Sequence, residues 1–167
     1  MQKNNWFEID KKGLQQVQSE KDKFFIIKEL VSNSFDEDIS ICDLNIKKES
    51  SDLLNITISD IFTPSYKKGI VNKRGRFNVG EKFALAMFNV AKIKSTTGSI
   101  LFKGNGTREK RSDKTEKGTL FSGQIKMSKQ DVSDLLEKSK SIIPPKKVSF
   151  YVNGDLVSRP ETYKSFT

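Results

Sequence analysis

Three polar side chains lie at helical spacing within residues 24–38, FFIIKELVSNSFDED. Glu29, Asn33 and Asp36 follow one another at i, i+4 and i+7, which places them along one stripe of a helix. The side-chain oxygen of asparagine is a hard, neutral ligand for Mg²⁺, and a glutamate one turn earlier can accept a proton from an attacking water. The stripe is thus suited to hydrolysis of a metal-bound phosphate, with Asn33 on the metal and Glu29 as general base. From these three residues alone, a solvated helix face without chemistry is the more common interpretation.

The apolar residues of the same segment predict the helix that must present this stripe. They recur mostly at steps of three and four residues, which is typical of one buried helical face. These residues are Phe24, Ile27, Leu30, Val31 and Phe35. Asp22 stands where an N-cap would serve the helix.

Composition bounds the class of protein. The 167 residues suffice for one domain with a proper core, and they carry a net charge of +9, a single cysteine and no histidine. Histidine-based zinc sites and Ser-His-Asp triads are therefore excluded within this chain, and so is a disulfide framework. No apolar run approaches membrane-spanning length, so we expect a cytoplasmic protein without a membrane partner. The basic charge favours polyanions, which include nucleotide phosphates and nucleic acid.

After Asp38 the pattern changes from helical to alternating, which predicts two antiparallel strands joined by a polar KKESSD turn. The apolar positions of these strands are Ile39, Ile41, Leu44 and Ile46 in the first, and Leu53, Leu54, Ile56 and Ile58 in the second. The second strand ends at Asp60. A carboxylate at the floor of a pocket can accept a hydrogen bond from an amine, although a strand-ending Asp is also a common turn former.

Residues 62–79 are basic, contain glycines and lack periodicity, which favours a lid or binding loop. They lead through Gly75 and Gly80 into a helix predicted from Glu81 to about Ala91. Backbone N–H groups and the positive end of a helix dipole converge at such a start, which makes it suited to phosphate.

The rest of the chain is predicted as strands, one helix and a final hairpin. Two strands flank Gly98, residues 104–118 form an exposed hairpin end, and Gly118 opens a further strand that reaches Met127. A helix capped by Ser128 follows. The last hairpin turns at Asn153–Gly154, a strong hairpin signal.

Four of these stretches, taken in order, resemble the motifs of the GHKL ATPases. That superfamily comprises type II topoisomerases, ninety-kilodalton heat-shock chaperones, histidine kinases and MutL mismatch-repair proteins. The first stretch, ELVSNSFDE, resembles E-L-x-x-N-x-x-D, and GRFNVGEK resembles the third motif, G-x-F-G-V-G, with Asn78 in place of its middle glycine. The second is degraded, because DIFTP has Phe62 and Pro64 where D-x-G-x-G has glycines. The fourth is the Gly-Thr dipeptide at Thr119.

The resemblance covers about residues 20–127 of a single domain, with a C-terminal helix and hairpin at 128–158. It implies a Bergerat fold: a two-layer α/β (α+β) sandwich in which a mixed, mostly antiparallel sheet is covered on one face by helices and carries an ATP lid. It also implies Mg²⁺-dependent binding of ATP and its hydrolysis to ADP and phosphate. The expected ligands of the nucleotide and its metal are Asn33, Asp36, Asp60, Gly75, Arg76, Asn78, Val79, Gly80, Glu81, Lys82 and Thr119, with Glu29 as the catalytic base.

Within this set the roles differ. The resemblance implies that Asp60 and Thr119 read adenine, that the amides from Asn78 to Glu81 cradle the phosphates, and that Asn33 holds the metal. Relatives also imply a nucleotide-dependent homodimer. Three alternatives stay open: a protein kinase of the histidine-kinase or anti-sigma type, a nucleotide-sensing module without turnover, and a nucleic-acid-binding domain that uses the basic surface.

Overall fold

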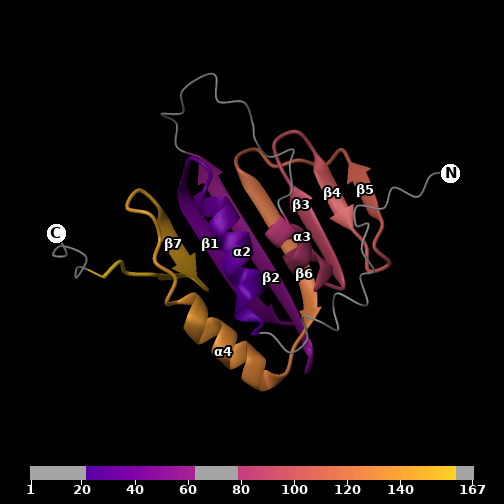
Figure 1. Cartoon of the computed structure of the whole chain (residues 1–167). Helices are drawn as coiled ribbons and strands as arrows, with labels where there is room; N and C mark the ends of the chain where they lie inside the picture. Colours follow the sequence, from indigo (N-terminus) through magenta and orange to yellow (C-terminus); the bar gives the residue numbers. More distant parts are fainter. Residues whose placement is uncertain (1–21, 63–78, 161–167) are drawn as a thin grey trace.

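The computed structural model describes residues 22–62 and 79–160, and within them it contains one eight-stranded sheet and three helices (Figure 1). The strand order is β5-β4-β3-β6-β2-β1-β7-β8. The elements in chain order are α2 (Phe24–Phe35), β1 (Ile39–Lys48), β2 (Leu53–Phe62), α3 (Val79–Ala86), β3 (Val90–Lys94), β4 (Ser99–Phe102), β5 (Arg108–Arg111), β6 (Thr119–Lys126), α4 (Lys129–Ser139), β7 (Ser149–Val152) and β8 (Asp155–Leu156).

The sheet is mixed but mostly antiparallel, and the described helices lie on one face of it (Figure 1). Every neighbouring pair of its strands is antiparallel except β1 and β7, which run parallel. Helix α2 is central to the helical layer, because it contacts α3, α4, β1 and β2. The expected α+β architecture, with helices over one face of such a sheet, is confirmed at this level.

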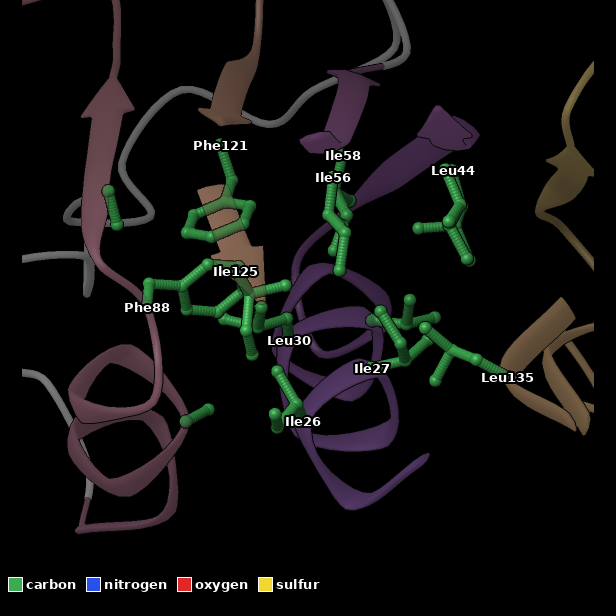
Figure 2. Close-up of a cluster of buried hydrophobic side chains, with 14 of the residues drawn as sticks. Ile26, Ile27, Leu30, Leu44, Ile56, Ile58, Phe88, Phe121, Ile125 and Leu135 are labelled. Atoms are coloured by element: carbon green, nitrogen blue, oxygen red, sulfur yellow. The ribbon is translucent and has the colours of Figure 1, made fainter. Parts of the chain in front are cut away.

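The core lies between α2 and the middle strands. Four α2 residues are buried: Ile26, Ile27, Leu30 and Val31. Figure 2 shows Ile27 and Leu30 on the side of this helix that faces the core residues of β1, β2 and β6, with Phe88 and Phe121 at one end and Leu135 of α4 at the other. Each such side chain contributes about 1.5–3 kcal/mol when removed from water, so this layer holds α2 in a fixed position over β1 and β2. Ile26 was not among the apolar positions predicted for this face.

The helix predicted from Glu81 to about Ala91 is shorter in the structure, and that prediction was wrong at its end. Helix α3 stops at Ala86, and the amide of Asn89 already donates to Gln124 O on β6 at 2.8 Å. From Val90 onward the residues alternate, with Ala91 buried and Lys92 half-exposed, which is the period of a strand. Residues 104–118 also contain more structure than the predicted hairpin end, because β5 forms an edge strand there.

A β-bulge between Ile39 and Ile41 shifts the register of β1 against β2. One extra residue on a strand reverses which side chains face the core. As a result, Cys42 is fully buried, whereas Ile41 is only half-buried. Alternation counted from Ile39 alone would place Ile41 on the buried face.

Two local predictions near the C-terminus are confirmed. The Ser128 side chain accepts a hydrogen bond from the Asp131 amide at 3.1 Å at the start of α4. Asn153 and Gly154 both have positive φ, +49° and +86°, in the turn between β7 and β8. In the described part of the chain, no helix combines the length and apolar character needed to cross a membrane.

Candidate functional site

Asp60 and Thr119 are brought together where β2 ends and β6 begins. They are register partners in the antiparallel β2–β6 pair, and the Thr119 amide donates to Asp60 Oδ1 at 3.0 Å. Asp60 is only 4% exposed. Its neighbours at alternate positions, Ile58 and Ile56, are buried against the helices, so the carboxylate lies on the helix-covered face of the sheet. A buried carboxylate at the end of a central strand is thus held in place by a backbone amide.

Gly118 is the residue that permits this close approach. Its φ is +65°, and a Cβ added there would lie 1.7 Å from the carbonyl oxygen of Asp60 and 3.2 Å from Cα of Ile61. No side chain fits that space, and L-residues rarely adopt this φ. The Gly-Thr dipeptide therefore has a local role: the glycine lets the backbone lie against β2, and the threonine follows directly opposite the carboxylate.

The hydroxyl oxygen of Thr119, Oγ1, is buried and makes no hydrogen bond within the part of the chain that the structure describes. Buried hydroxyls are normally hydrogen-bonded, so one without a partner indicates a water or ligand position. Thr119 and Phe121 are two residues apart on β6, so Oγ1 lies on the same helix-covered face as the Asp60 carboxylate.

Helix α2 ends at the same end of the sheet as Asp60. The helix stops at Phe35, β1 begins at Ile39, and Ile39 is the register partner of Phe62, two residues after Asp60. The last turn of α2 therefore lies near the end of β2, and Figure 1 shows the helix crossing over β1 and β2.

The three residues of the polar stripe occupy different surroundings on α2. Glu29 and Asn33 are half-buried, and the Asn33 amide nitrogen has no exposed surface. Both therefore lie at the border between the buried face of the helix and solvent. Asp36 is exposed and is the C-cap of the helix, where its own amide donates to the carbonyl of Ser32 at 3.0 Å and the next amide, that of Glu37, donates to the carbonyl of Ser34 at 3.2 Å.

Cys42 is a neighbour of Asp60 that sequence reasoning did not place at the site. It is the register partner of Asp60 and is fully buried. Burial, followed by the negative charges of Asp60 and Asp43, raises the pKa of its thiol to about 12. The thiol therefore remains protonated and inert. The signal that could have found it is a change of phase in the apolar pattern of β1, because Ile39 and Ile41 stand at odd positions whereas Leu44 and Ile46, in phase with Cys42, stand at even ones.

Part of the predicted phosphate loop lies outside the described residues. This holds for Gly75, Arg76 and Asn78, and for residues 63–78 of the lid expected over 62–79. Val79 and Gly80 form the first residues of α3, which therefore starts two residues before the Glu81 of the prediction. Glu81 and Lys82 also belong to this helix, and α3 packs against α2.

No protein-family model matches the sequence, and no curated protein matches it at a significant level.

Proposed function

We propose that this protein binds Mg²⁺·ATP between the end of α2 and the Asp60–Thr119 pair, and hydrolyses it to ADP and phosphate. The observation that carries the proposal is the pair itself: the buried carboxylate of Asp60 lies beside the buried hydroxyl of Thr119 on the helix-covered face, and that hydroxyl makes no hydrogen bond to the described residues. The second support is sequence order, because the four GHKL-like stretches supply the parts of such a site in the expected succession.

The pair suits adenine rather than guanine. The Asp60 carboxylate accepts hydrogen bonds only, so it can accept one from the exocyclic amine of adenine. Guanine presents a carbonyl oxygen at the same ring position, and two acceptors facing each other repel. Thr119 Oγ1 can both donate and accept, so it can complete the polar edge of the base directly or through a water.

The α2 residues suit the phosphate end of the nucleotide. The side-chain oxygen of Asn33 would hold Mg²⁺, which neutralises phosphate charge when bound. Glu29, one turn earlier, orients and deprotonates the attacking water. The start of α3 would add backbone amides and a positive helix dipole near the phosphates.

Hydrolysis and binding measured on the same variants test the proposal. Glu29→Ala should lower the rate of ATP hydrolysis about 100-fold or more while the Kd for ATP stays close to the wild-type value, since it removes a base and not a ligand. Asn33→Ala should weaken both binding and turnover, because the metal ligand is lost. Ser32→Ala is the matched control: Ser32 is an exposed residue on the same helix, and its substitution should change neither quantity.

Different results would point to different functions. Wild-type turnover in Glu29→Ala would remove Glu29 as the base. Binding of ATP without release of phosphate would favour the nucleotide-sensing alternative, and transfer of the phosphate to a protein would favour the kinase. Equal affinity for ATP and GTP would contradict the adenine site.

A further inference from the structure

Residues 112–118, which connect β5 to β6, are held to the sheet by one carboxylate. Asp113 Oδ2 pairs with Lys92 Nζ and lies 3.3 Å from Lys94 Nζ, and its Oδ1 accepts a hydrogen bond from the Ser99 hydroxyl. Lys92 and Lys94 alternate with the core-facing Ala91 and Ile93 along β3. Asp113 therefore binds side chains on the face of the sheet opposite to the helices.

The connection is fixed at a second point closer to the site. The Thr115 amide donates to Ser95 O at 2.9 Å, and the Thr115 hydroxyl donates to Gly118 O at 2.8 Å. Gly118 in turn lies against the backbone of Asp60. An unbroken series of contacts thus runs from Asp113 to the Asp60–Thr119 pair.

These polar contacts are what order the connection, because it buries no apolar side chain. Its side chains at positions 112, 114, 116 and 117 are exposed, and those of Asp113 and Thr115 are half-buried. A segment without apolar burial has little to offset the entropy of ordering its backbone, about 1–2 kcal/mol per residue. Removal of the Asp113 charge would leave the two lysines and Ser99 without their shared acceptor.

We propose that Asp113 is a positioning residue for adenine recognition, which holds Gly118 and Thr119 against Asp60 from the opposite face of the sheet. This inference rests on the proposed function. Hydrogen bonds from Lys92 and Ser99 hold the pKa of the Asp113 carboxyl well below its usual range, so the contact persists at all physiological pH values. Asp113 itself does not touch the nucleotide; it acts through the backbone at positions 115–119.

The test compares two ligands that differ by one group. ATP and purine riboside triphosphate are alike except that the second lacks the 6-amino group, so the ratio of their affinities measures recognition of that amine alone. We would measure both Kd values with Mg²⁺ by calorimetry on the full chain. In wild type ATP should bind more tightly. In Asp113→Asn the advantage of ATP should fall about tenfold, the effect of losing one hydrogen bond to a charged acceptor.

The control is a carboxylate with a similar environment but no link to Gly118. Glu109 on β5 pairs with Lys103 Nζ at 2.9 Å and Arg111 Nε at 3.1 Å, and Glu109→Gln should leave the ratio unchanged. Simple destabilisation would weaken both ligands equally and leave the ratio intact. If Asp113→Asn does not fold, Lys94→Met removes only the 3.3 Å contact and should lower the ratio by a smaller factor.

The outcomes separate the two proposals. If wild type prefers ATP and Asp113→Asn keeps the same ratio of affinities, the role of Asp113 is overturned while the ATP site stands. The same holds for Lys94→Met where that variant is used instead. A wild-type protein that binds neither ligand, or binds both equally, overturns the adenine site itself and with it the role of Asp113.

Discussion

Replacement of Gly118 by alanine should be the most damaging small substitution in the described part of the site. The added methyl carbon would lie 1.7 Å from the carbonyl oxygen of Asp60 and 2.8 Å from the carbonyl carbon. Because Cβ atoms do not approach closer than 3.0 Å, the oxygen and the methyl must separate by about 1.3 Å. Both are attached to backbone at the junction of two central strands, so no flexible side chain can absorb that movement.

The magnitude follows from two contributions. An L-residue in the left-handed region costs about 1–2 kcal/mol. Separation of the strands also weakens the bond from the Thr119 amide to Asp60 Oδ1, and a hydrogen bond to a charged group contributes about 1.5–3 kcal/mol. We therefore expect Gly118→Ala to lower the free energy of unfolding by about 2.5–5 kcal/mol, a large part of the roughly 5–15 kcal/mol of an ordinary domain.

Two glycines with similar backbones provide the control for urea denaturation. Gly106 and Gly154 have φ of +83° and +86°, and an added Cβ would meet nothing within 4 Å at either position. Their alanine variants should show only the conformational cost of the left-handed backbone, about 1–2 kcal/mol. If Gly118→Ala is no less stable than these two, the close contact between Gly118 and Asp60 is refuted, and with it the reason for a glycine before Thr119.

Three further predictions concern individual side chains. Asn153→Ala should lower the free energy of unfolding in urea by about 2 kcal/mol, because the Asn153 side chain accepts from Ile46 N at 2.8 Å and donates to Ile46 O at 3.3 Å. Asn105→Ala loses only exposed hydrogen bonds and should cost under about 0.5 kcal/mol. Equal costs would show that the two bonds between Asn153 and Ile46 do not stabilise the fold. Cys42, whose pKa is raised to about 12, should react with iodoacetamide at pH 8 only after unfolding, and rapid labelling of native protein would show that the thiol is exposed. Hydrogen bonds from Lys92 and Ser99 lower the pKa of Asp113, so the stability that this carboxylate contributes should be complete above the ordinary pKa of 3.8 and fade as pH falls further. The difference in Tm between wild type and Asp113→Asn should therefore hold from pH 7 to 5 and shrink towards pH 2. A difference that does not depend on pH would contradict this.

Local signals in the sequence predicted the local structure well. Asn153–Gly154 forms the predicted turn, Ser128 caps α4, and the apolar alternation around KKESSD gives β1 and β2. In each case the determining interactions lie within a few residues of one another, so pattern alone contains them. The end of α3 was missed because Phe88 and Ala91 are apolar at a spacing that suits a helix, whereas pairing with β6 decides the conformation of the backbone from Asn89 onward.

The site depends on contacts that spacing does not encode. Asp60 and Thr119 are 59 residues apart, and only the motif order of the resemblance implied that they meet. Cys42 lies opposite Asp60 because a bulge shifts β1 against β2, and Asp113 reaches Lys92 on β3 because of how the edge strands are paired. Long-range register is a property of the whole sheet, so a single sequence does not reveal it.

The most direct test of the central claim is an NMR titration of ¹⁵N-labelled protein with Mg²⁺·ATP. We expect a saturable shift of the Thr119 amide, which donates to Asp60 at 3.0 Å, and of amides in the last turn of α2. Amides of Arg108–Arg111, on the far edge strand β5, should not move. Saturation that leaves Thr119 unchanged, or no binding up to about 5 mM ATP, several times the upper end of usual KM values, would contradict an adenine site at the Asp60–Thr119 pair.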